Sequence, residues 1–450
     1  MGSKSLSVGR RPQSALQVSQ VSPCDLPYRA ELVLRQPFLF KSDKSFPMRD
    51  TVLFLAHVPT PAVNRGFLPV AKSMGLKVIL LTDQAATHHH YFSQPDLPAY
   101  PDQILQCDVF NPLSVIDLLS ELPAPLGVFS NSDHLQTVTA LAAAYLNLPG
   151  KDWQTCYRAK NKAAMRQYLK AIDDGACWFR AVNDQTSLGK VIDDVPFPCI
   201  AKPREGVASL NVRRLDNAAQ LQSFCDQFWQ EQPGQPLLLE EFLSGPVHTL
   251  ETIGDGNSLI ALGGFEVRLS EPPHFVELEA AWVPYQPDSP HLQEMFRQVR
   301  RFGVGLGACH SEFVITDNGP RLIEINYRTV GDGREFLLDR MTNHGLFHAI
   351  LQAHVGNPLE LSPPTQAAQI RYLSASTSGR VRRSAPERRE PCGDGIAEFE
   401  PLRKVGDDVR LTHSNKDYLG VLRLFSSDPS RVQDTLAEWA TDLEAEWEIG

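Results

Sequence analysis

Apolar residues in the first part of the chain alternate between two spacings, one typical of buried strands and one typical of helices. The runs of strand length are 52–56, 77–82 and 126–130, and the segments with helical spacing are 66–74 and 137–146. Strands that alternate with helices predict a parallel sheet, with ligand-binding groups at the carboxyl ends of its strands. Asn131 and Asp133 are expected to cap the second helix. No Gly-x-Gly-x-x-Gly sequence follows the first strand, which argues against a dinucleotide site.

The pattern changes beyond residue 150. Residues 158–171 predict one helix, and short strands with turn signals then indicate a small α+β module. These strands are 198–203, 237–243 and 248–253. A helix through Phe296 and Val299 follows, and the chain closes with a strand and an amphipathic helix, at 420–425 and 432–447. Residues before about 48 are polar and irregular, which indicates an extension.

Residues 310–328 carry the most informative pattern of the chain. They predict two strands around a turn at 317–320, because Asn-Gly supplies the positive φ angles that a hairpin turn needs. A loop of three residues would pair Thr316 with Pro320. The strands around the turn are mainly apolar, so we expect this hairpin to pack in a core.

This register places Glu312 opposite Glu324, with Asn326 two residues further on the same face. Like charges that face each other destabilise a sheet by roughly 0.2–1 kcal/mol. A hard cation bound by these oxygens, with nucleotide phosphates completing its shell, would explain why they converge. A polar face that points at solvent is the alternative.

Composition limits the classes of function. A chain of 450 residues predicts two to four domains, and its net charge of −10 argues against nucleic acid as a partner. The eight cysteines are scattered without a Cys-x-x-Cys pair, which favours reduced thiols. No apolar run approaches the roughly 18 residues of a membrane span, and the start lacks a secretion or myristoylation signal. We expect a soluble cytoplasmic protein with no membrane partner.

Three more segments place groups that suit an anionic ligand. Lys162 stands near a helix start, and Lys202 ends a strand before the small-residue loop 206–209, whose backbone N–H groups can approach phosphate oxygens. The apolar strand 237–243 runs into two acids and can present its backbone to an adenine edge. Each signal is weak alone, because a lysine at a strand end is usually a solvated surface group.

In this order, the segments NKAAMR, CIAKPREGVAS, LLLEEFLSG, HTLE and HSEFVITDNGPRLIEINYR resemble the ATP-grasp superfamily over about residues 50–360. The resemblance implies α/β and α+β parts: an N-terminal Rossmann-like parallel-sheet domain, then two α+β subdomains that grip a nucleotide. The expected divisions are an extension (1–48), the N-terminal domain (49–150), the ATP-grasp domain (151–360, with a mobile lid at about 185–250) and a C-terminal α+β subdomain (361–450). The implied cofactors are ATP and two Mg²⁺ ions, with Mn²⁺ as an alternative.

The resemblance also implies roles for single residues. The ATP-binding set is Lys162, Lys202, Gly206, Ser209, Glu240, Glu241, Phe242, Leu243 and His248; the metal set is Glu312, Glu324 and Asn326; the catalytic set is Lys202 and Arg328. The lysines would neutralise phosphates, and Arg328 would stabilise the transferred phosphoryl group or an acyl phosphate. His248 stands where many members carry an acid, so the ribose contact stays open between Glu241 and another group. Tyr327 and residues 329–333 depart from the usual sequence after the metal hairpin, which bears on the substrate more than on catalysis.

The implied function is that of an ATP-dependent carboxylate–amine ligase. An amine cannot displace oxide from a carboxylate at neutral pH, whereas phosphorylation by ATP makes an acyl phosphate with a good leaving group. The concentrated negative charge then calls for lysines, an arginine and a cation, under a cover that excludes water. Two alternatives stay open: a phosphotransferase that stops at the phosphorylated product, and a non-catalytic nucleotide-binding protein.

Residues 272–284, PPHFVELEAAWVP, resemble the amino-acid ligase branch, where the Phe-Val-Glu strand lines the substrate pocket. An exposed strand is the alternative. The candidate substrate-binding set is Arg268, Glu277, Arg328, Gly331 and Arg334, with Glu277 for an ammonium and Arg268 or Arg334 for a carboxylate. The expected partners are a small-molecule carboxylate and amine, and a homodimer is left open. The chain also resembles ATP-grasp ligases of siderophore assembly.

Two charged clusters are expected to be solvated. Residues 88–90 are three consecutive histidines, which cannot converge well on one metal ion, so a solvated loop is expected there. The tail carries an arginine cluster at 380, 382, 383, 388 and 389, for which binding of an anion is the alternative.

Overall fold

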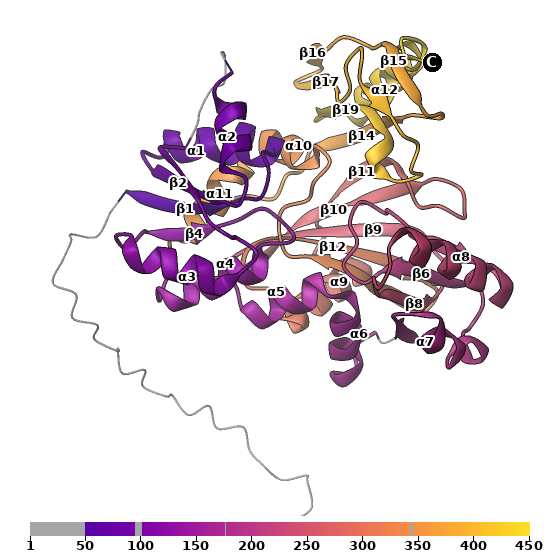
Figure 1. The fold of residues 1–450 in the computed structure, drawn as a ribbon. Coiled ribbons are helices and arrows are strands. Elements are labelled where there is room, and N and C mark those ends of the chain that lie inside the picture. Colours follow the sequence, from indigo (N-terminus) through magenta and orange to yellow (C-terminus); the bar gives the residue numbers. More distant parts are fainter. Residues whose placement is uncertain (1–49, 95–100, 176, 343–344) are drawn as a thin grey trace, which may run out of the picture. The chain divides into compact units, whose positions relative to one another are not determined.

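The computed structural model describes residues 50–94, 101–175, 177–342 and 345–450 (Figure 1). The expected extension over residues 1–48, with Cys24, lies outside the described residues. Seven cysteines fall within them, and all seven are buried free thiols. No helix in the described part of the chain is long and apolar enough to cross a membrane.

The first sheet is parallel throughout, with strand order β3-β2-β1-β4. Its strands are β1 (Thr51–Leu55), β2 (Lys77–Thr82), β3 (Gln103–Gln106) and β4 (Gly127–Phe129). Its helices are η1 (Ala62–Phe67), α1 (Leu68–Ser73), α2 (Ala85–Phe92), α3 (Pro112–Glu121) and α4 (Gln136–Tyr145). All residues of β1 are buried, as expected for a parallel sheet, which is covered on both faces. The predicted parallel sheet is confirmed.

The second sheet is antiparallel, with strand order β5-β8-β6-β7. Its elements are β5 (Phe179–Val182), α7 (Gln185–Gly189), η2 (Ile192–Asp194), β6 (Cys199–Pro203), β7 (Arg213–Leu215), α8 (Ala218–Glu231) and β8 (Leu237–Glu241). It has a hydrophobic cluster of its own, in which Leu221 and Phe228 of α8 lie with Leu237 and Leu239 of β8. We call residues 179–241 the lid module, because they overlap the lid predicted at about 185–250; the movement of this module stays a prediction.

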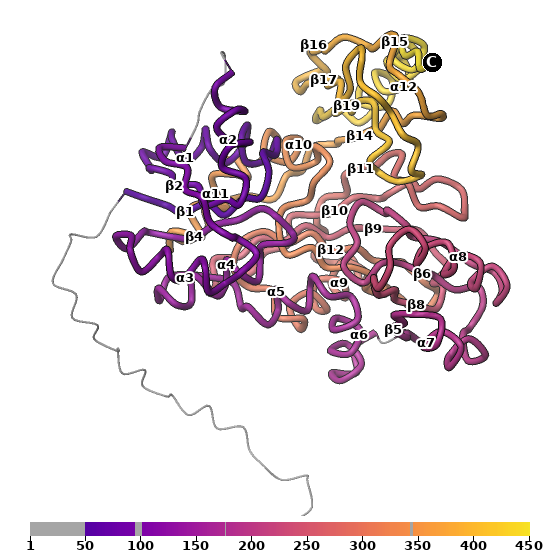
Figure 2. Tube along the Cα trace, in the orientation of Figure 1, coloured from indigo at the N-terminus to yellow at the C-terminus, as the bar shows by residue number. Residues whose placement is uncertain are grey.

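The third sheet has nine antiparallel strands in the order β13-β12-β9-β10-β11-β14-β19-β17-β16. Its strands are β9 (Val247–Asp255), β10 (Leu259–Leu269), β11 (Glu277–Pro284), β12 (Leu306–Thr316), β13 (Gly319–Asn326), β14 (Ala367–Ser374), β16 (Arg388–Cys392), β17 (Gly395–Pro401) and β19 (Tyr418–Ser426). Pairing of β11 with β14 continues this sheet into the C-terminal strands (Figure 2). The C-terminal strands therefore belong to the same sheet as the hairpin of β12 and β13.

The remaining elements flank these sheets. They are α5 (Trp153–Lys160), α6 (Lys162–Ala171), α9 (Pro290–Phe302), α10 (Arg334–Met341), α11 (Leu346–His354), η3 (Asn415–Asp417), α12 (Pro429–Ala445) and a small sheet of β15 (Gly379–Arg383), β18 (Asp408–Val409) and β20 (Glu448–Ile449). Phe347 of α11 meets Phe67 of η1 at 4.8 Å between ring centroids, within a core cluster that also includes residues of β1, β9 and β10. This cluster joins the first sheet to the third.

The prediction of one helix over residues 158–171 is wrong. Asn161 ends α5 and begins α6, with φ −92° and ψ 98°, and its side chain accepts a hydrogen bond from the Ala164 N–H. This cap satisfies a free donor of the first turn of α6. The break leaves Lys162 in the first turn of α6.

Both charged clusters were predicted to be solvated, and this prediction is confirmed for most of the tail arginines but is wrong for His88. Residues 88–90 lie in α2 instead of a solvated loop, and His88 is buried with its Nε2 3.3 Å from the His57 carbonyl oxygen. No group of three or more His, Cys, Asp or Glu side chains in the described residues is placed to hold a metal ion. The tail arginines are mostly exposed, except that Arg388 is half-buried over the Trp439 ring.

Candidate functional site

One cavity of about 420 Å³ is lined by residues of the lid module and of the third sheet. It brings together most residues of the sequence prediction: Lys162, Lys202, Gly206, Ser209, Glu240, Glu241, Phe242, Leu243, Glu277, Glu312, Glu324, Asn326, Arg328, Gly331 and Arg334. These residues come from segments far apart in the chain, so the cavity exists only in the folded protein.

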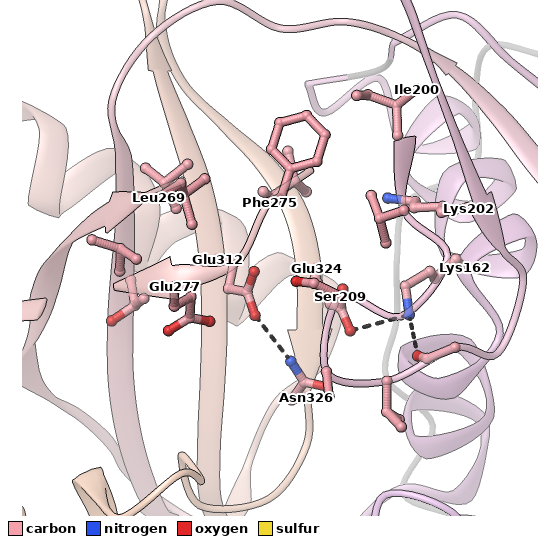
Figure 3. A pocket seen from close by; sticks show the side chains of 18 of the residues that line it. Lys162, Ile200, Lys202, Ser209, Leu269, Phe275, Glu277, Glu312, Glu324 and Asn326 are labelled. Carbon is pink, nitrogen blue, oxygen red and sulfur yellow. Dashed lines mark hydrogen bonds and ion pairs between the residues drawn. The ribbon is translucent and has the colours of Figure 1, made fainter. Parts of the chain in front are cut away.

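The hairpin of β12 and β13 places two carboxylates face to face in this cavity (Figure 3). Glu312 pairs with Glu324, as predicted, but the predicted pairing of Thr316 with Pro320 is wrong, because Thr316 pairs with Gly319. A two-residue loop moves the register by one, and a bulge between Glu312 and Phe313 moves it back. Phe313 is fully buried, which confirms that the hairpin packs in a core.

Each of the two carboxylates has a neighbouring donor. The Lys162 Nζ lies 3.1 Å from Glu324 Oε1 and donates to the Gly206 carbonyl oxygen at 2.9 Å (Figure 3). The Asn326 Nδ2 donates to Glu312 Oε1 at 3.5 Å (Figure 3). Lys162 therefore connects the small-residue loop 206–209 of the lid module to the hairpin.

The buried side chain of His310 lies between Glu251 and Glu312. The His310 Nδ1 is 2.7 Å from Glu251 Oε1, and its Nε2 is 3.3 Å from Glu312 Oε1. Burial alone would lower the pKa of His310, but the two carboxylates outweigh burial and raise this pKa to about 9. His310 was not among the predicted site residues, although it stands two residues before Glu312 and so shares its face of the strand.

Glu240 is the centre of a buried ion-pair network. Its Oε1 accepts from the Arg166 Nε at 2.5 Å, and its Oε2 lies 2.6 Å from the Lys202 Nζ. Burial by itself raises the pKa of Glu240, but Arg166 and Lys202 outweigh burial and lower this pKa to about 2. Arg166 was not among the predicted site residues, although it follows Lys162 by four residues and so shares its helix face.

The small-residue loop of the lid module has an unusual backbone. Ala208, Ser209 and Asn211 all have positive φ, between 55° and 59°. Non-glycine residues rarely adopt this conformation, and where they do, the surroundings must hold them there. The Asn415 N–H donates to the Ala208 carbonyl oxygen at 3.1 Å, so part of that support comes from η3.

Arg328 and its neighbour Thr329 are held by the loop that follows β4. Its Nη2 donates to Asp133 Oδ2 at 2.8 Å, and Asn131 Oδ1 accepts from the Thr329 N–H at 3.4 Å. The prediction that Asn131 and Asp133 cap the next helix is wrong: Leu135 stands at the N-cap of α4 without a side-chain cap bond. Both side chains follow β4 at its carboxyl end, where parallel sheets present ligand-binding groups.

The other end of the cavity combines charged and apolar groups. The Arg334 Nη2 is 2.7 Å from Glu277 Oε2, whereas the Arg334 Nε and Nη1 have no hydrogen-bond partner within the described residues. The apolar lining residues at this end are Val267, Leu269 and Phe275. We call the part lined by Glu277, Arg334 and these residues the substrate end, and the part lined by the lid module the nucleotide end.

His248 and Arg268 do not line the cavity, in contrast to the other predicted residues. The His248 Nε2 lies 3.5 Å from Glu266 Oε1, and Arg268 pairs with Glu279. The cause is the alternation of a strand: Val267 and Leu269 of β10 line the cavity, so Glu266 and Arg268 point to its other face. The sequence of β10 alone does not show which face of the strand points into the cavity.

The oxygens at the hairpin fit a hard divalent cation. The carboxylates of Glu312 and Glu324 face each other beside Lys162. The Asn326 Nδ2 faces Glu312, so its amide oxygen would join these two ligands once the amide group turns over. Mg²⁺ prefers such oxygen ligands and commonly uses one or two carboxylates, with phosphate oxygens and water completing its shell. The donor set therefore suits a cation that is bound together with a phosphate-bearing ligand.

Comparison with known proteins agrees with this geometry. A family model described as an ATP-grasp domain matches residues 131–332. A relative in Sinorhizobium fredii (strain NBRC 101917 / NGR234), named uncharacterized protein y4rH, is 24% identical over 89% of this chain and 84% of its own. Dapdiamide A synthase of Enterobacter agglomerans is 25% identical over 56% of this chain and 62% of its own length. The solved L-amino acid ligase from Bacillus licheniformis superposes with a TM-score of 0.68 at 18% identity, covering 89% of this chain and 98% of the other, which shows a shared fold.

Proposed function

Because the chain has the ATP-grasp fold and carries an ATP-grasp domain, we propose that it is an ATP-dependent ligase that joins a carboxylate to an amine. The reaction passes through an acyl phosphate and releases ADP and inorganic phosphate. One substrate is an amino acid, a choice supported by the names of two similar proteins, dapdiamide A synthase and L-amino acid ligase.

The observation that carries this proposal is the pairing of Glu312 with Glu324 beside Lys162, in the same cavity as Lys202 and Arg328. Facing carboxylates repel each other, and Lys162 and His310 each contact only one of the two, so a cation bound between them would relieve the repulsion. When bound there, Mg²⁺ would draw negative charge from the triphosphate and orient it for transfer. Mg²⁺ would be held by Glu312, Glu324 and Asn326.

The remaining residues divide the work of the reaction between them. Lys162 and Lys202 bind phosphate oxygens, and the loop from Gly206 to Ser209 covers them and excludes water, which would hydrolyse an acyl phosphate. The backbone after Glu240 contacts the adenine. Arg328, oriented by Asp133, neutralises the charge that develops on the transferred phosphoryl group.

The substrate end suits a carboxylate-bearing molecule. Arg334 is 2% exposed and keeps two N–H donors without a partner among the residues described. Unpartnered buried donors cost free energy, and a substrate carboxylate would satisfy them. Val267, Leu269 and Phe275 then favour a substrate with an apolar part.

The same proposal includes five further features that were predicted from the sequence. They are the lid boundaries, the division at residues 150 and 360, a second Mg²⁺ ion, a cytoplasmic location and a homodimer. The lid module has its own hydrophobic cluster, and this supports movement as a unit. A role in siderophore assembly stays a prediction from sequence resemblance.

The test is a screen for ADP and phosphate release with Mg²⁺, ATP and the standard amino acids, supplied singly and in pairs. A ligase releases both products only when carboxylate and amine are both present, and the amide appears in equal amount. Formation of a stable phosphorylated product with a single substrate would instead support the phosphotransferase. Absence of any substrate-dependent ADP release across the panel would contradict the proposal.

A further inference from the structure

Asp332 lies on a loop of fixed geometry at the substrate end. It lines the cavity, with a φ of +57°, between Gly331 and Gly333. The Gly333 carbonyl oxygen accepts from the Arg423 Nε at 2.9 Å, and a Cβ on Gly333 would come within 2.6 Å of the Arg423 Nη2. A left-handed backbone held in this way is typical of functional positions.

Asn415 holds the Asp332 side chain from a distant part of the sequence. Its Nδ2 donates to Asp332 Oδ2 at 3.3 Å, and its Oδ1 accepts from the Glu277 N–H at 3.2 Å. Its backbone N–H binds the Ala208 carbonyl oxygen at 3.1 Å. One buried residue thus contacts the loop of Asp332, the start of β11 and the small-residue loop of the lid module.

Asp332 differs from the other carboxylates of the cavity in its charge balance. The other carboxylates that have a basic partner are Asp133 with Arg328, Glu240 with Arg166 and Lys202, Glu277 with Arg334, Glu312 with His310, and Glu324 with Lys162. Glu241, at the nucleotide end, accepts from the Trp178 N–H. Asp332 accepts only from the Asn415 amide and has no ion pair within the described residues. Arg328 and Arg334 lie within electrostatic reach of Asp332 but form no ion pair with it, so at the substrate end its carboxylate has no direct basic partner in the described part of the chain until a ligand binds.

We propose that Asp332 binds the ammonium group of the amine substrate and accepts one of its protons. This proposal rests on the ligase function proposed above. The free amine then attacks the carbonyl carbon of the acyl phosphate: a carbon–nitrogen bond forms and the bond from that carbon to the phosphate oxygen breaks. Of the three ammonium protons, one goes to Asp332, one leaves with the phosphate and one stays on the amide nitrogen.

Hydroxylamine provides the test, because it is mostly uncharged at neutral pH and traps an acyl phosphate as a hydroxamate. In Asp332→Asn, hydroxamate formation should stay within about twofold of wild type. Ligation to an ammonium-bearing acceptor should fall by roughly 100-fold or more, as expected for loss of a general base. The substrates are the amino-acid pair with the fastest ADP release, with ammonia and simple alkylamines as further acceptors.

Glu271→Gln is the matched control, because Glu271 is exposed, lies between β10 and β11 outside the cavity, and loses the same charge. It should leave both reactions unchanged. Equal loss of both reactions in Asp332→Asn, or no loss of amine ligation, would overturn the role of Asp332. A wild type that makes hydroxamates but uses no ammonium-bearing acceptor would also overturn it. A wild type that makes neither hydroxamate nor ADP would instead overturn the ligase function itself.

Asn415→Ala tests the positioning of Asp332. The variant keeps the backbone bond to Ala208 and loses both side-chain bonds, so the KM for the amine should rise about tenfold while hydroxamate formation is unchanged. In the double variant Asn415→Ala with Asp332→Asn, the loss should match that of Asp332→Asn alone, because the two residues act as one unit. Additive losses would show that Asn415 acts independently of Asp332.

Discussion

The two ends of the cavity are built in different ways. The nucleotide end takes its charged groups from within regular elements, and its buried carboxylate, Glu240 of β8, is fully paired with Arg166 of α6 and Lys202 of β6. The substrate end takes single residues from several segments and leaves Asp332 without a basic partner. A triphosphate presents dense charge that a fixed network can meet, whereas a substrate brings its own charges. The buried carboxylate of the first end is therefore paired before any ligand binds, whereas Asp332 of the second is not.

The largest effect is expected where the two ends meet, at the hairpin. Glu324→Ala removes one of the two facing carboxylates, so the rate of ADP release should fall by roughly 100-fold to 1000-fold. The fold should survive, because the Glu324 side chain is 24% exposed and carries no core packing. Thermal unfolding and ADP release measure the two effects.

Asp317→Ala is the control for this variant, because it removes an exposed acid from the turn of the same hairpin. It should keep wild-type activity. If Glu324→Ala consumed ATP at the wild-type rate, the metal site would lie elsewhere. The hairpin would then not be the point where the two ends of the cavity meet.

Glu240→Gln should weaken the fold, and the effect should depend on pH. The pKa of Glu240 lies at about 2, against an ordinary value of 4.5, so its pairing stabilises the protein fully above pH 4.5. That stability is lost as the pH falls towards 2. The variant should lose on the order of 3 kcal/mol of unfolding free energy at pH 7 and lack this part of the pH dependence.

Urea unfolding at pH 7 and at low pH measures this difference. Glu241→Gln is the control, because Glu241 has no ion pair within the described residues and accepts only from the Trp178 N–H. An unchanged pH dependence in Glu240→Gln would show that the nucleotide end is not held by this network.

Lys202→Ala should weaken the binding of ATP without weakening the binding of the other two substrates. The Lys202 Nζ lies at the nucleotide end, so ATP binding should weaken by roughly tenfold to 100-fold, while the KM values of the carboxylate and amine stay within twofold. Lys190→Ala, at an exposed position of the lid module, should change neither. Equal weakening for ATP and the other substrates would mean that the two ends are not separate.

The smallest effects are expected on the outer face of the substrate end. Arg268→Ala and His248→Ala remove side chains that do not line the cavity, so kcat and all KM values should stay within about twofold. Arg268 pairs with Glu279 on the surface, where such pairs contribute little. A tenfold rise in the KM of a carboxylate for Arg268→Ala would restore its predicted role.

The sequence predicts the nucleotide end better than the substrate end for a physical reason. Strand alternation places Glu312 and Glu324 on one face, and the resemblance assigned Lys162. Strand alternation and helix spacing could also have located His310 and Arg166 next to these residues. The position of Glu324 was found although the loop length was wrong, because a bulge restores the register. Local rules hold within an element, and most of the nucleotide end lies within elements.

The substrate end depends on contacts between elements. Asp133 and Asn415 reach the cavity from a loop after β4 and from η3, and no spacing in the sequence relates them to Arg328 or Asp332. The face of β10 that lines the cavity is likewise set by its pairing with β9 and β11, and so Arg268 was assigned to the wrong side. Such contacts follow only from the folded chain.

In the proposed reaction, Glu312 and Glu324 hold a divalent cation against a triphosphate. Calorimetric titration with a non-hydrolysable ATP analogue, with and without Mg²⁺, tests it most directly. The wild type should bind the analogue at least about tenfold more tightly with Mg²⁺, and Glu312→Gln with Glu324→Gln should bind it equally in both conditions. A double variant that kept the full dependence on Mg²⁺ would contradict the account.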